Sequence, residues 1–480
     1  MLATLFGSTR GESLVLTPAG FFAGSAKSAN QMVGIVRGLE AYNIDQVYQA
    51  LYDPDLVRES LAGDPDGEIK KTAAVLDLPK LLASGQAPRV GLISPTTTGA
   101  SQQELITVEA RITDTGGGIG RVEWRVNGTT VGVSATAPGT GKERNIKQTL
   151  ALEPGENTIE VVAYNRRNLL SSLAASTSVT WNAPANLPKP KFFVIAVGIN
   201  NYNDRIFPKL SHAVGDAKAF GAAMKEAGRS LYADVDVTYV LDGDATAAGL
   251  QKAIEGVGAR MQPRDTFIFL AAAHGKSENG RFHLIPQDYR SADRQFITNG
   301  TIDQEQLQDW FANRIKARRG LILLDTCESG ALVASRASGV DLGNSEAAMG
   351  RLNEAIGRPV LTAAAADQAA LEGYRGHGVF TYALLDALVN GDTNGDGEIE
   401  LSELVAHIQT LTPKLSHEMR AGRGKAIPAQ KQASRAAIAL GDAPIASRYA
   451  DYRQKPRLGT RGEDFPLVNR LKALPAAAAQ

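Results

Sequence analysis

Hydrophobic and polar residues follow two different periods in the two main parts of this chain. Between residues 87 and 183, Val, Ile and Thr alternate with polar residues, and turns that contain Gly or Asn separate the runs. This two-residue period predicts an all-β sandwich. From residue 191 to residue 441, short apolar runs alternate with amphipathic stretches of helical period, with a last strand expected at Arg435–Leu440. That order predicts an α/β domain in which helices flank a doubly wound, mostly parallel sheet.

Three further segments lie outside these two domains. Residues 1–86 predict a hairpin at Gly11–Ser25 and helices that are interrupted at Asp53-Pro54. Residues 184–190 are rich in Pro and predict an extended linker. We expect residues 442–480 to form a C-terminal tail.

Two of the apolar runs in the α/β domain end at residues that carry chemistry. The run DTFIFLAAA is followed by His274, and the run RGLILLD ends two residues before Cys327. Because parallel strands place their carboxyl ends at one edge of a sheet, we expect both side chains there. Cys327 is the only cysteine, so it cannot form an intrachain disulfide. A lone cysteine is usually a small buried hydrophobe, but a neighbouring histidine would make it a nucleophile.

The order strand-His-Gly, then strand-Asp-x-Cys-x-Ser-Gly roughly 50 residues later, resembles the caspase-like cysteine peptidases. Within that family it is most similar to the metacaspase and bacterial orthocaspase branch. The resemblance covers about residues 191–440. It implies a caspase-like fold and a cysteine endopeptidase in which Cys327 attacks the scissile carbonyl and His274 activates the thiol. It also implies that the backbone N–H of Gly275, together with that of Cys327, binds the oxyanion.

Several residues near these positions depart from the pattern of the family. Ala272-Ala273 precede the histidine where Ser-Gly is usual, and Glu328 stands where metacaspases often have His. These departures leave the catalytic groups in place. A second His-Gly pair, His377-Gly378, follows a loop and opens a helix, so we prefer His274 as the base.

Two carboxylates are candidates for substrate recognition. Asp325 lies two residues before Cys327, and Asp216 lies at the start of a predicted helix after the first strand of the domain. In metacaspase-like enzymes the matching aspartates line the pocket for the residue before the scissile bond, which implies cleavage after Arg or Lys. The family's frequent Cys three residues before the first aspartate is Ala213 here. The alternatives are a helix N-cap for Asp216 and a strand-end hydrogen-bond acceptor for Asp325.

Residues 392–403, DTNGDGEIELSE, match the template of the twelve-residue calcium loop of EF-hands. The ligands would be Asp392, Asn394, Asp396, Glu398 through its carbonyl, Glu400 and Glu403. The alternative is a polar loop whose Asx and Gly residues turn the chain between two helices. Calcium is therefore the one cofactor that we expect, and we expect no organic cofactor.

The parts of the chain without catalytic motifs also resemble known modules. Residues 87–183 are similar to bacterial immunoglobulin-like modules, which bind, space or support other domains. Residues 1–86 resemble the tail that follows β-propeller repeats in some bacterial caspase-like proteins, with a hairpin and helices packed on a neighbouring domain as the alternative. We expect a protein partner to bind through one of these two regions.

The loop of residues 331–347 is small, polar and rich in Gly and Ser. Such a composition suits a mobile segment that the enzyme cleaves itself at Arg336, or an ordinary surface loop.

Composition narrows the function further. Lys and Arg number 51, as do Asp and Glu, so we expect no nucleic-acid partner. The sequence contains no run of 18 consecutive apolar residues, so we expect no membrane-spanning helix. Met1 is not followed by a secretory signal, so we expect a cytoplasmic protein, with export as the alternative for a truncated N-terminus.

Two functional alternatives stay open beside a peptidase with basic specificity that acts on proteins or peptides. One is a catalytically weak or silent caspase-fold module for signalling or binding. The other is a peptidase that cleaves after acidic residues.

Overall fold

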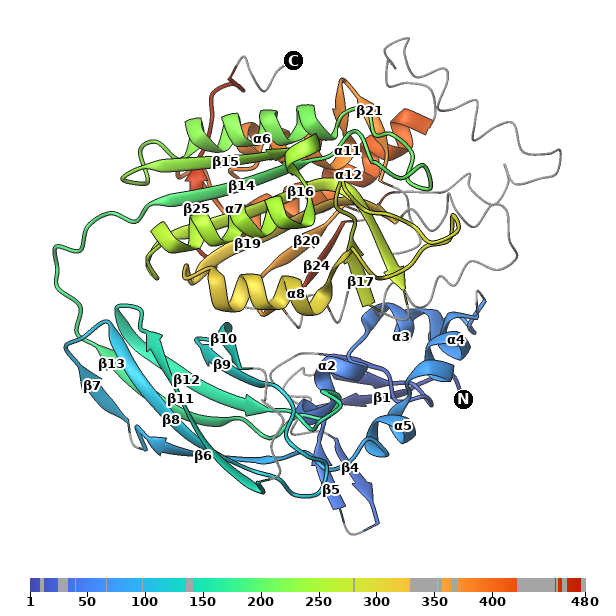
Figure 1. Ribbon diagram of the computed structural model, residues 1–480, viewed down its shortest axis with the longest axis vertical. Helices are drawn as coiled ribbons and strands as arrows, with labels where there is room; N and C mark the ends of the chain where they lie inside the picture. Colours follow the sequence, from blue (N-terminus) through green and yellow to red (C-terminus); the bar gives the residue numbers. More distant parts are fainter. Residues whose placement is uncertain are drawn as a thin grey trace.

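The computed structural model describes most of the chain. The described residues are 1–8, 13–24, 33–38, 40–65, 67–96, 98–134, 141–278, 281–328, 352, 356–363, 370–420, 454, 456–459 and 464–475. Figure 1 shows two parts: an α/β domain in green to red, and an N-terminal half in blue to cyan. The extended chain of residues 184–190 runs between them.

A central sheet organises the α/β domain. Its strands lie in the order β15-β14-β16-β19-β20-β24, and only β24 is antiparallel to its neighbour. The strand bounds are β14 Phe192–Gly198, β15 Val235–Leu241, β16 Thr266–Glu278, β19 Arg319–Glu328, β20 Val360–Thr362 and β24 Arg457–Gly459. The prediction of a doubly wound, mostly parallel sheet is confirmed. Both faces of β14, β16 and β19 are buried, so their sequences are continuous apolar runs. These runs allowed the three strands to be predicted.

Helices cover both faces of this sheet (Figure 1). One face packs against α6 Ala213–Ala227, α11 Val379–Asn390 and α12 Leu401–Arg420. The other face packs against α7 Ala247–Arg260, α8 Gln304–Asp309 and the π-helix η3 Trp310–Arg314. Beyond the carboxyl end of β16, a short antiparallel extension adds β17 Arg281–Leu284 and β18 Ile302–Asp303.

The α/β domain extends past residue 441, so the predicted boundary is wrong. The edge strand is β24, and the predicted strand Arg435–Leu440 lies outside the described residues. A further strand, β25 Pro466–Asn469, pairs with β23 Glu398–Glu400. Leu467 and Val468 are fully buried against α11 and α12. These strands of three and four residues are too short to show a period in the sequence.

The N-terminal half contains the predicted β-sandwich. One sheet has the order β11-β8-β6 and the other β10-β9-β12-β13-β7, and they enclose a core around Trp124 and Trp181. The bounds are β6 Arg89–Ser94, β7 Gly99–Ser101, β8 Leu105–Thr113, β9 Val122–Val126, β10 Thr129–Ser134, β11 Glu143–Ala151, β12 Gly155–Ala163 and β13 Ala175–Trp181.

Short strands and helices precede the sandwich. They are β1 Thr4–Gly7, β2 Ser13–Leu16, β3 Phe22–Gly24, β4 Gly34–Arg37, β5 Glu40–Asn43, η1 Ile44–Val47, α2 Tyr48–Leu51, α3 Pro54–Leu61, α4 Glu68–Val75 and α5 Leu78–Leu82. The helical break falls where the sequence placed it. Asp53 accepts a hydrogen bond from the backbone of Leu56 (2.9 Å) and so caps α3, whose first residue is Pro54.

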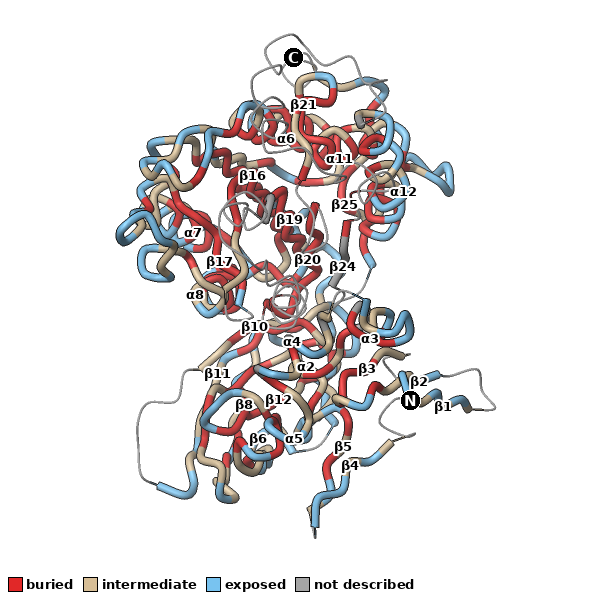
Figure 2. Tube along the Cα trace, turned by 90° about the vertical axis from the view of Figure 1, so that its right-hand side faces the viewer, coloured by how far each residue is buried: buried red, intermediate tan, exposed pale blue. Residues whose placement is uncertain are grey.

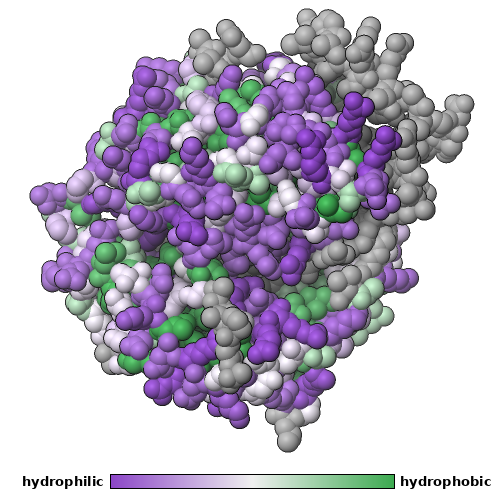
Figure 3. Space-filling view, in the orientation of Figure 1, coloured by the Kyte–Doolittle hydropathy of each residue, from purple (hydrophilic) through white to green (hydrophobic). Residues whose placement is uncertain are grey.

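Burial follows the sheets of both halves (Figure 2). The strands β16, β19 and β20 form a continuous buried band, whereas exposed residues gather on loops and outer helix faces. Hydrophilic side chains predominate on the face seen in Figure 3, where hydrophobic side chains are scattered. Within the described residues, no helix combines the length and the apolarity needed to cross a membrane.

Candidate active site

The pairing of β16 with β19 determines where the predicted catalytic residues lie. In this parallel register His274 is the partner of Cys327, and Gly275 is the partner of Glu328. His274 and Cys327 therefore lie side by side at the carboxyl edge of the sheet, as the sequence predicted. The backbone of Cys327 belongs to the described strand, and its side chain lies outside the described part of the structure.

His274 is held from three sides. It is 1 % exposed, and its Nε2 lies 2.7 Å from the carbonyl oxygen of Pro208. Its backbone N–H donates to the hydroxyl of Tyr202 (2.7 Å), and its ring lies 4.8 Å from the Tyr202 ring. Its carbonyl accepts from the N–H of Ile285 (3.0 Å). The imidazole is thus fixed by loops that are distant in the chain.

These contacts define the protonation state of His274. Because a carbonyl can only accept, the Nε2 of His274 carries a proton, and Nδ1 of the neutral ring is left as the acceptor. Nδ1 has no hydrogen-bond partner among the described residues. Burial lowers the pKa of His274 to about 4, against the opposing effect of the Pro208 carbonyl. The ring is therefore neutral at neutral pH, and Nδ1 is its nitrogen that can accept a proton.

Gly275 is confined by its neighbours. A Cβ atom at this position would lie 2.7 Å from Cε2 of Phe282 and 3.1 Å from Oγ1 of Thr326. Only glycine fits without a shift of the aromatic ring. The position next to the histidine is thus limited to glycine unless Phe282 moves.

Asp216 and Asp325 both lie close to Gly378. A Cβ atom on Gly378 would lie 3.2 Å from Oδ2 of Asp216 and 3.0 Å from Oδ2 of Asp325. Asp216 accepts hydrogen bonds from Nδ1 of His377 (2.6 Å) and from the N–H of Gly378 (2.9 Å). Asp325 accepts one from the hydroxyl of Thr381 (2.7 Å). The two predicted recognition residues therefore share one buried site.

A third carboxylate lines the same site. Glu372 belongs to β21 Glu372–Tyr374 and accepts a hydrogen bond from the N–H of Ser211 (3.1 Å). The cavity is lined by Leu210, Ala213, Asp216, Ala272, Ala273, Asp325, Ala370, Leu371, Glu372 and Gly378. Its free volume is about 10 Å³, roughly the space of one water molecule. A long side chain therefore does not fit into this free volume as it stands.

Burial dominates the electrostatics of this cavity. It raises the pKa of Asp325 to about 7, and the charge of Asp216 adds to the shift. Burial also raises the pKa of Asp216, against hydrogen bonds from His377 and Gly378, and that of Glu372. Burial and mutual repulsion thus disfavour the simultaneous ionisation of these three carboxyl groups.

Two sequence interpretations need correction here. The helix begins at Ala213, with His212 at the N-cap position, so Asp216 is not an N-cap. His377 does not simply open a helix: it forms β22 His377–Gly378 ahead of α11 and binds Asp216. The sequence gives no signal for the contact of His377 with Asp216, because the hairpin of β21 and β22 brings His377 to α6.

The predicted calcium loop connects α11 to α12. Its acidic side chains accept backbone hydrogen bonds within the loop: Gly397 N–H donates to Asp392 (3.1 Å), and Asn394 N–H donates to Glu403 (3.1 Å). Gly397 at the sixth position has a φ of 89°, which favours glycine. Among the described residues, no group of three or more His, Cys, Asp or Glu side chains is arranged to hold a metal ion.

A stability measurement tests the charge state of the cavity. Burial raises the pKa of Asp325 from 3.8 to about 7. Between pH 3.8 and about pH 7, this carboxyl is therefore protonated in the folded state and ionised in the unfolded state. This group therefore lowers stability as pH rises through that window, by about 1.4 kcal/mol per unit. Asp325→Asn removes this effect, so its stability advantage over wild type should grow from pH 4 to pH 7 in urea unfolding. Asp234→Asn, at an exposed position, is the control, and an equal pH profile for all three proteins would contradict the assignment.

Comparison with known proteins identifies both domains. The family model described as the caspase domain matches residues 191–437, and the model described as the bacterial Ig domain matches residues 88–161. No curated protein matches the chain.

Solved structures with similar folds include caspases at low identity. The Drosophila initiator caspase Dronc is 11 % identical, with 47 % of this chain and 72 % of that chain covered and a TM-score of 0.29. Pro-sf-caspase-1 is 13 % identical, with 57 % and 88 % covered and a TM-score of 0.33. A protein from Geobacter sulfurreducens is 17 % identical, with 59 % and 99 % covered and a TM-score of 0.35.

The family assignment depends on the sequence model of the caspase domain, since these TM-scores are low. That model spans slightly more than half of the chain and includes β16, β19 and the residues at their ends. The chain belongs to the caspase family of cysteine peptidases and has a bacterial immunoglobulin-like domain ahead of its caspase domain.

Proposed function

We propose that this chain is a caspase-like endopeptidase of the metacaspase or orthocaspase type that cleaves after Arg or Lys. The observation that carries the proposal is the pairing of His274 with Cys327 beside a buried cavity with three carboxyl groups. The caspase domain implies protein substrates.

The first half of the reaction forms a thioester. The thiol of Cys327 gives its proton to Nδ1 of His274, the nitrogen that the Pro208 contact leaves unprotonated. The thiolate attacks the scissile carbonyl carbon, and the carbonyl π-electrons move to oxygen. When the tetrahedral intermediate collapses, the C–N bond breaks, and the imidazolium of His274 protonates the leaving amine.

The second half hydrolyses the thioester. The neutral imidazole takes a proton from water as the water attacks the acyl carbon, and the C–S bond breaks. The imidazolium then returns its proton to the departing thiolate of Cys327, which regenerates both groups. In both tetrahedral intermediates, the backbone N–H of Gly275 is the proposed donor to the oxyanion.

The cavity of Asp216, Asp325 and Glu372 is the proposed pocket for the basic side chain. A guanidinium or ammonium group would meet charge-assisted hydrogen bonds and relieve the repulsion between the carboxylates. An acidic side chain would add a further negative charge to a buried site, which argues against the alternative of acidic specificity. Glu372 was absent from the sequence predictions because it lies on a hairpin far from both aspartates in the chain.

The alternative of a silent module accounts less well for the geometry. It gives no role to the buried, neutral imidazole of His274, which the strand register pairs with Cys327 and whose Nδ1 has no hydrogen-bond partner among the described residues. Self-processing at Arg336 remains a prediction, since that residue lies outside the described residues.

Calcium binding to residues 392–403 is a second proposal. The donor types and spacing fit the ion: Asp392, Asn394 and Asp396 occupy alternate positions, and helices flank the loop. The strand β23 within the loop pairs with β25, which holds the C-terminal segment against the domain. Calcium would supply charge neutralisation for the loop, and its role would be structural.

Replacement of the catalytic pair tests the proposed chemistry. Cys327→Ala and His274→Ala should each lower kcat/KM for Arg peptides on the order of 10⁴-fold or more, with no further loss in the double variant. His407→Ala is the matched control, since this partly exposed histidine pairs with Asp386 on the outer helices. Circular dichroism checks the fold. Substantial peptidase activity in Cys327→Ala would exclude the mechanism.

Removal of one carboxylate tests the specificity. Asp216→Ala should raise KM for Arg-ending peptides on the order of a hundredfold, because a buried cation loses its partner. The rate of thiol alkylation by iodoacetamide should stay unchanged. Asp386→Ala serves as the control carboxylate. If Asp-ending peptides are cleaved faster than Arg-ending peptides by wild type, the pocket assignment is wrong.

Melting curves test the calcium proposal. A ligand at about 100 times its Kd adds about 2.7 kcal/mol to folding stability. Millimolar calcium should therefore raise the Tm of wild type, and the rise should vanish in Asp392→Ala/Glu403→Ala. The calcium-induced shift is compared rather than Tm itself, because Glu403 also accepts backbone hydrogen bonds. Equal shifts in both proteins would refute the site, and magnesium is the control ion.

A further inference from the structure

The described residues between 1 and 183 form a single body. Leu170 of the immunoglobulin-like domain is fully buried in the hydrophobic cluster of the N-terminal segment, together with residues such as Phe22 and Leu51. Gln46 and Ser171 exchange two hydrogen bonds of 3.0 Å, one from the Gln46 side chain and one from the Ser171 backbone. A shared core and a shared pair of hydrogen bonds make this N-terminal body one packed unit.

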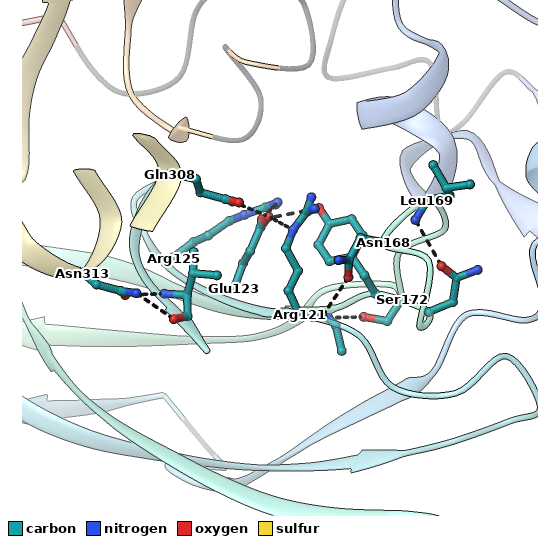
Figure 4. Close-up of polar contacts among 12 residues, drawn as sticks. Arg121, Glu123, Arg125, Asn168, Leu169, Ser172, Gln308 and Asn313 are labelled. Carbon is teal, nitrogen blue, oxygen red and sulfur yellow. Dashed lines mark hydrogen bonds and ion pairs between the residues drawn. The ribbon is translucent and has the colours of Figure 1, made fainter. Parts of the chain in front are cut away.

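Polar contacts join the N-terminal body to the caspase domain, unlike the shared hydrophobic core within the N-terminal body. Asn313 of η3 exchanges two hydrogen bonds with the backbone of Val133, at 2.8 and 3.0 Å (Figure 4). Nε2 of Gln308 on α8 donates a hydrogen bond to Glu123 (3.4 Å), and Arg318 forms an ion pair with Glu153 (3.5 Å). Among the described residues, no hydrophobic cluster combines side chains of the two parts.

The caspase domain covers an edge strand of the sandwich. The strand β10 lies at the end of its sheet, and its pairing with β9 shifts between Thr130 and Gly132. This bulge adds one residue, so the N–H groups of Thr130 and Val133 both point away from β9. Thr130 donates to the carbonyl of Gly357 (3.3 Å), and Val133 donates to Asn313. The caspase domain thus satisfies the backbone groups that an edge strand exposes.

Gly357 shows that this contact is fitted closely. Its φ of 65° favours glycine, and a Cβ atom there would lie 2.2 Å from Oγ1 of Thr130. A residue with a side chain would strain the backbone and collide with the sandwich.

All these contacts lie near the amino ends of two strands of the central sheet. Gln308 and Asn313 lie on the helical segment that leads into β19, and Gly357 leads into β20. The buried guanidinium of Arg358 donates to the carbonyls of Ile315 (2.9 Å) and Ala317, which links the segments that precede the two strands. Cys327 lies at the opposite end of β19.

The buried charge of the N-terminal body is paired without the caspase domain. Glu123 is fully buried, and it forms ion pairs with Arg121 (2.9 Å) and Arg125 (2.7 Å), each two residues away in the chain (Figure 4). Separation would therefore leave Glu123 with both of its cationic partners. Polar interfaces between domains of this kind permit separation, unlike a shared hydrophobic core.

We propose that the N-terminal body is a preassembled support that docks reversibly on the caspase domain. Docking holds the amino ends of β19 and β20 and thereby the strand that carries the nucleophile. In the docked state, the caspase domain of the same chain covers the free edge of β10. The inference does not depend on the proposed peptidase activity.

The test uses the full chain in a Cys327→Ala background, with a site for a specific protease inserted in residues 184–190. After the linker is cut, size-exclusion chromatography and sedimentation measure whether the two fragments remain together. Hydrogen exchange on the uncut chain measures protection of the amino ends of β19 and β20. The variants are Asn313→Ala, which removes both bonds to Val133, and Asn145→Ala, an exposed asparagine on β11 that makes no contact with the caspase domain among the described residues.

The cut fragments should stay associated at micromolar concentration, with Asn145→Ala unchanged. Asn313→Ala should raise their dissociation constant at least tenfold and speed exchange selectively at the amino ends of β19 and β20. Fragments that separate fully without any interface substitution would overturn docking. Fragments that never separate on dilution would overturn its reversibility. Equal exchange in Asn313→Ala and Asn145→Ala would overturn the claim that docking holds the amino ends of both strands.

Discussion

The parallel register between β16 and β19 is the constraint on which the proposed site depends. A shift by one residue would turn His274 to the opposite face of the sheet from Cys327, because successive side chains in a strand alternate. Ten pairs of residues along both strands, most of them buried and apolar, specify this register. The core packing of the α/β domain thus determines the position of the chemistry at its edge.

Loops outside the two strands then orient His274 and add a third carboxyl group to the site. The carbonyl of Pro208 fixes the tautomer of His274, and the hairpin that ends at Gly378 brings Glu372 to the two aspartates. The free volume of this cavity is about 10 Å³, and burial raises the pKa of its carboxyl groups. The proposed binding of a cation would therefore favour the loss of a proton from the cavity.

The sequence predicts the elements whose signal is local and misses those that depend on distant contacts. Continuous apolar runs identify β14, β16 and β19, and the ends of two of these strands lead directly to His274 and Cys327. Pro208, Glu372 and the role of His377 have no such signal, because a backbone carbonyl has no sequence signature and a hairpin sets the other two. The edge strand β24 and the strand β25 escape prediction for a simpler reason, since runs of three or four residues show no period.

Covalent trapping of the nucleophile would test the central claim most directly. A peptide that ends in Arg and carries an electrophilic chloromethyl ketone should modify the intact protein once, and peptide mass mapping should place the adduct on Cys327. An otherwise identical peptide that ends in Asp should react far more slowly. An adduct on another residue, no adduct at all, or preferential labelling by the Asp peptide would contradict the proposed function.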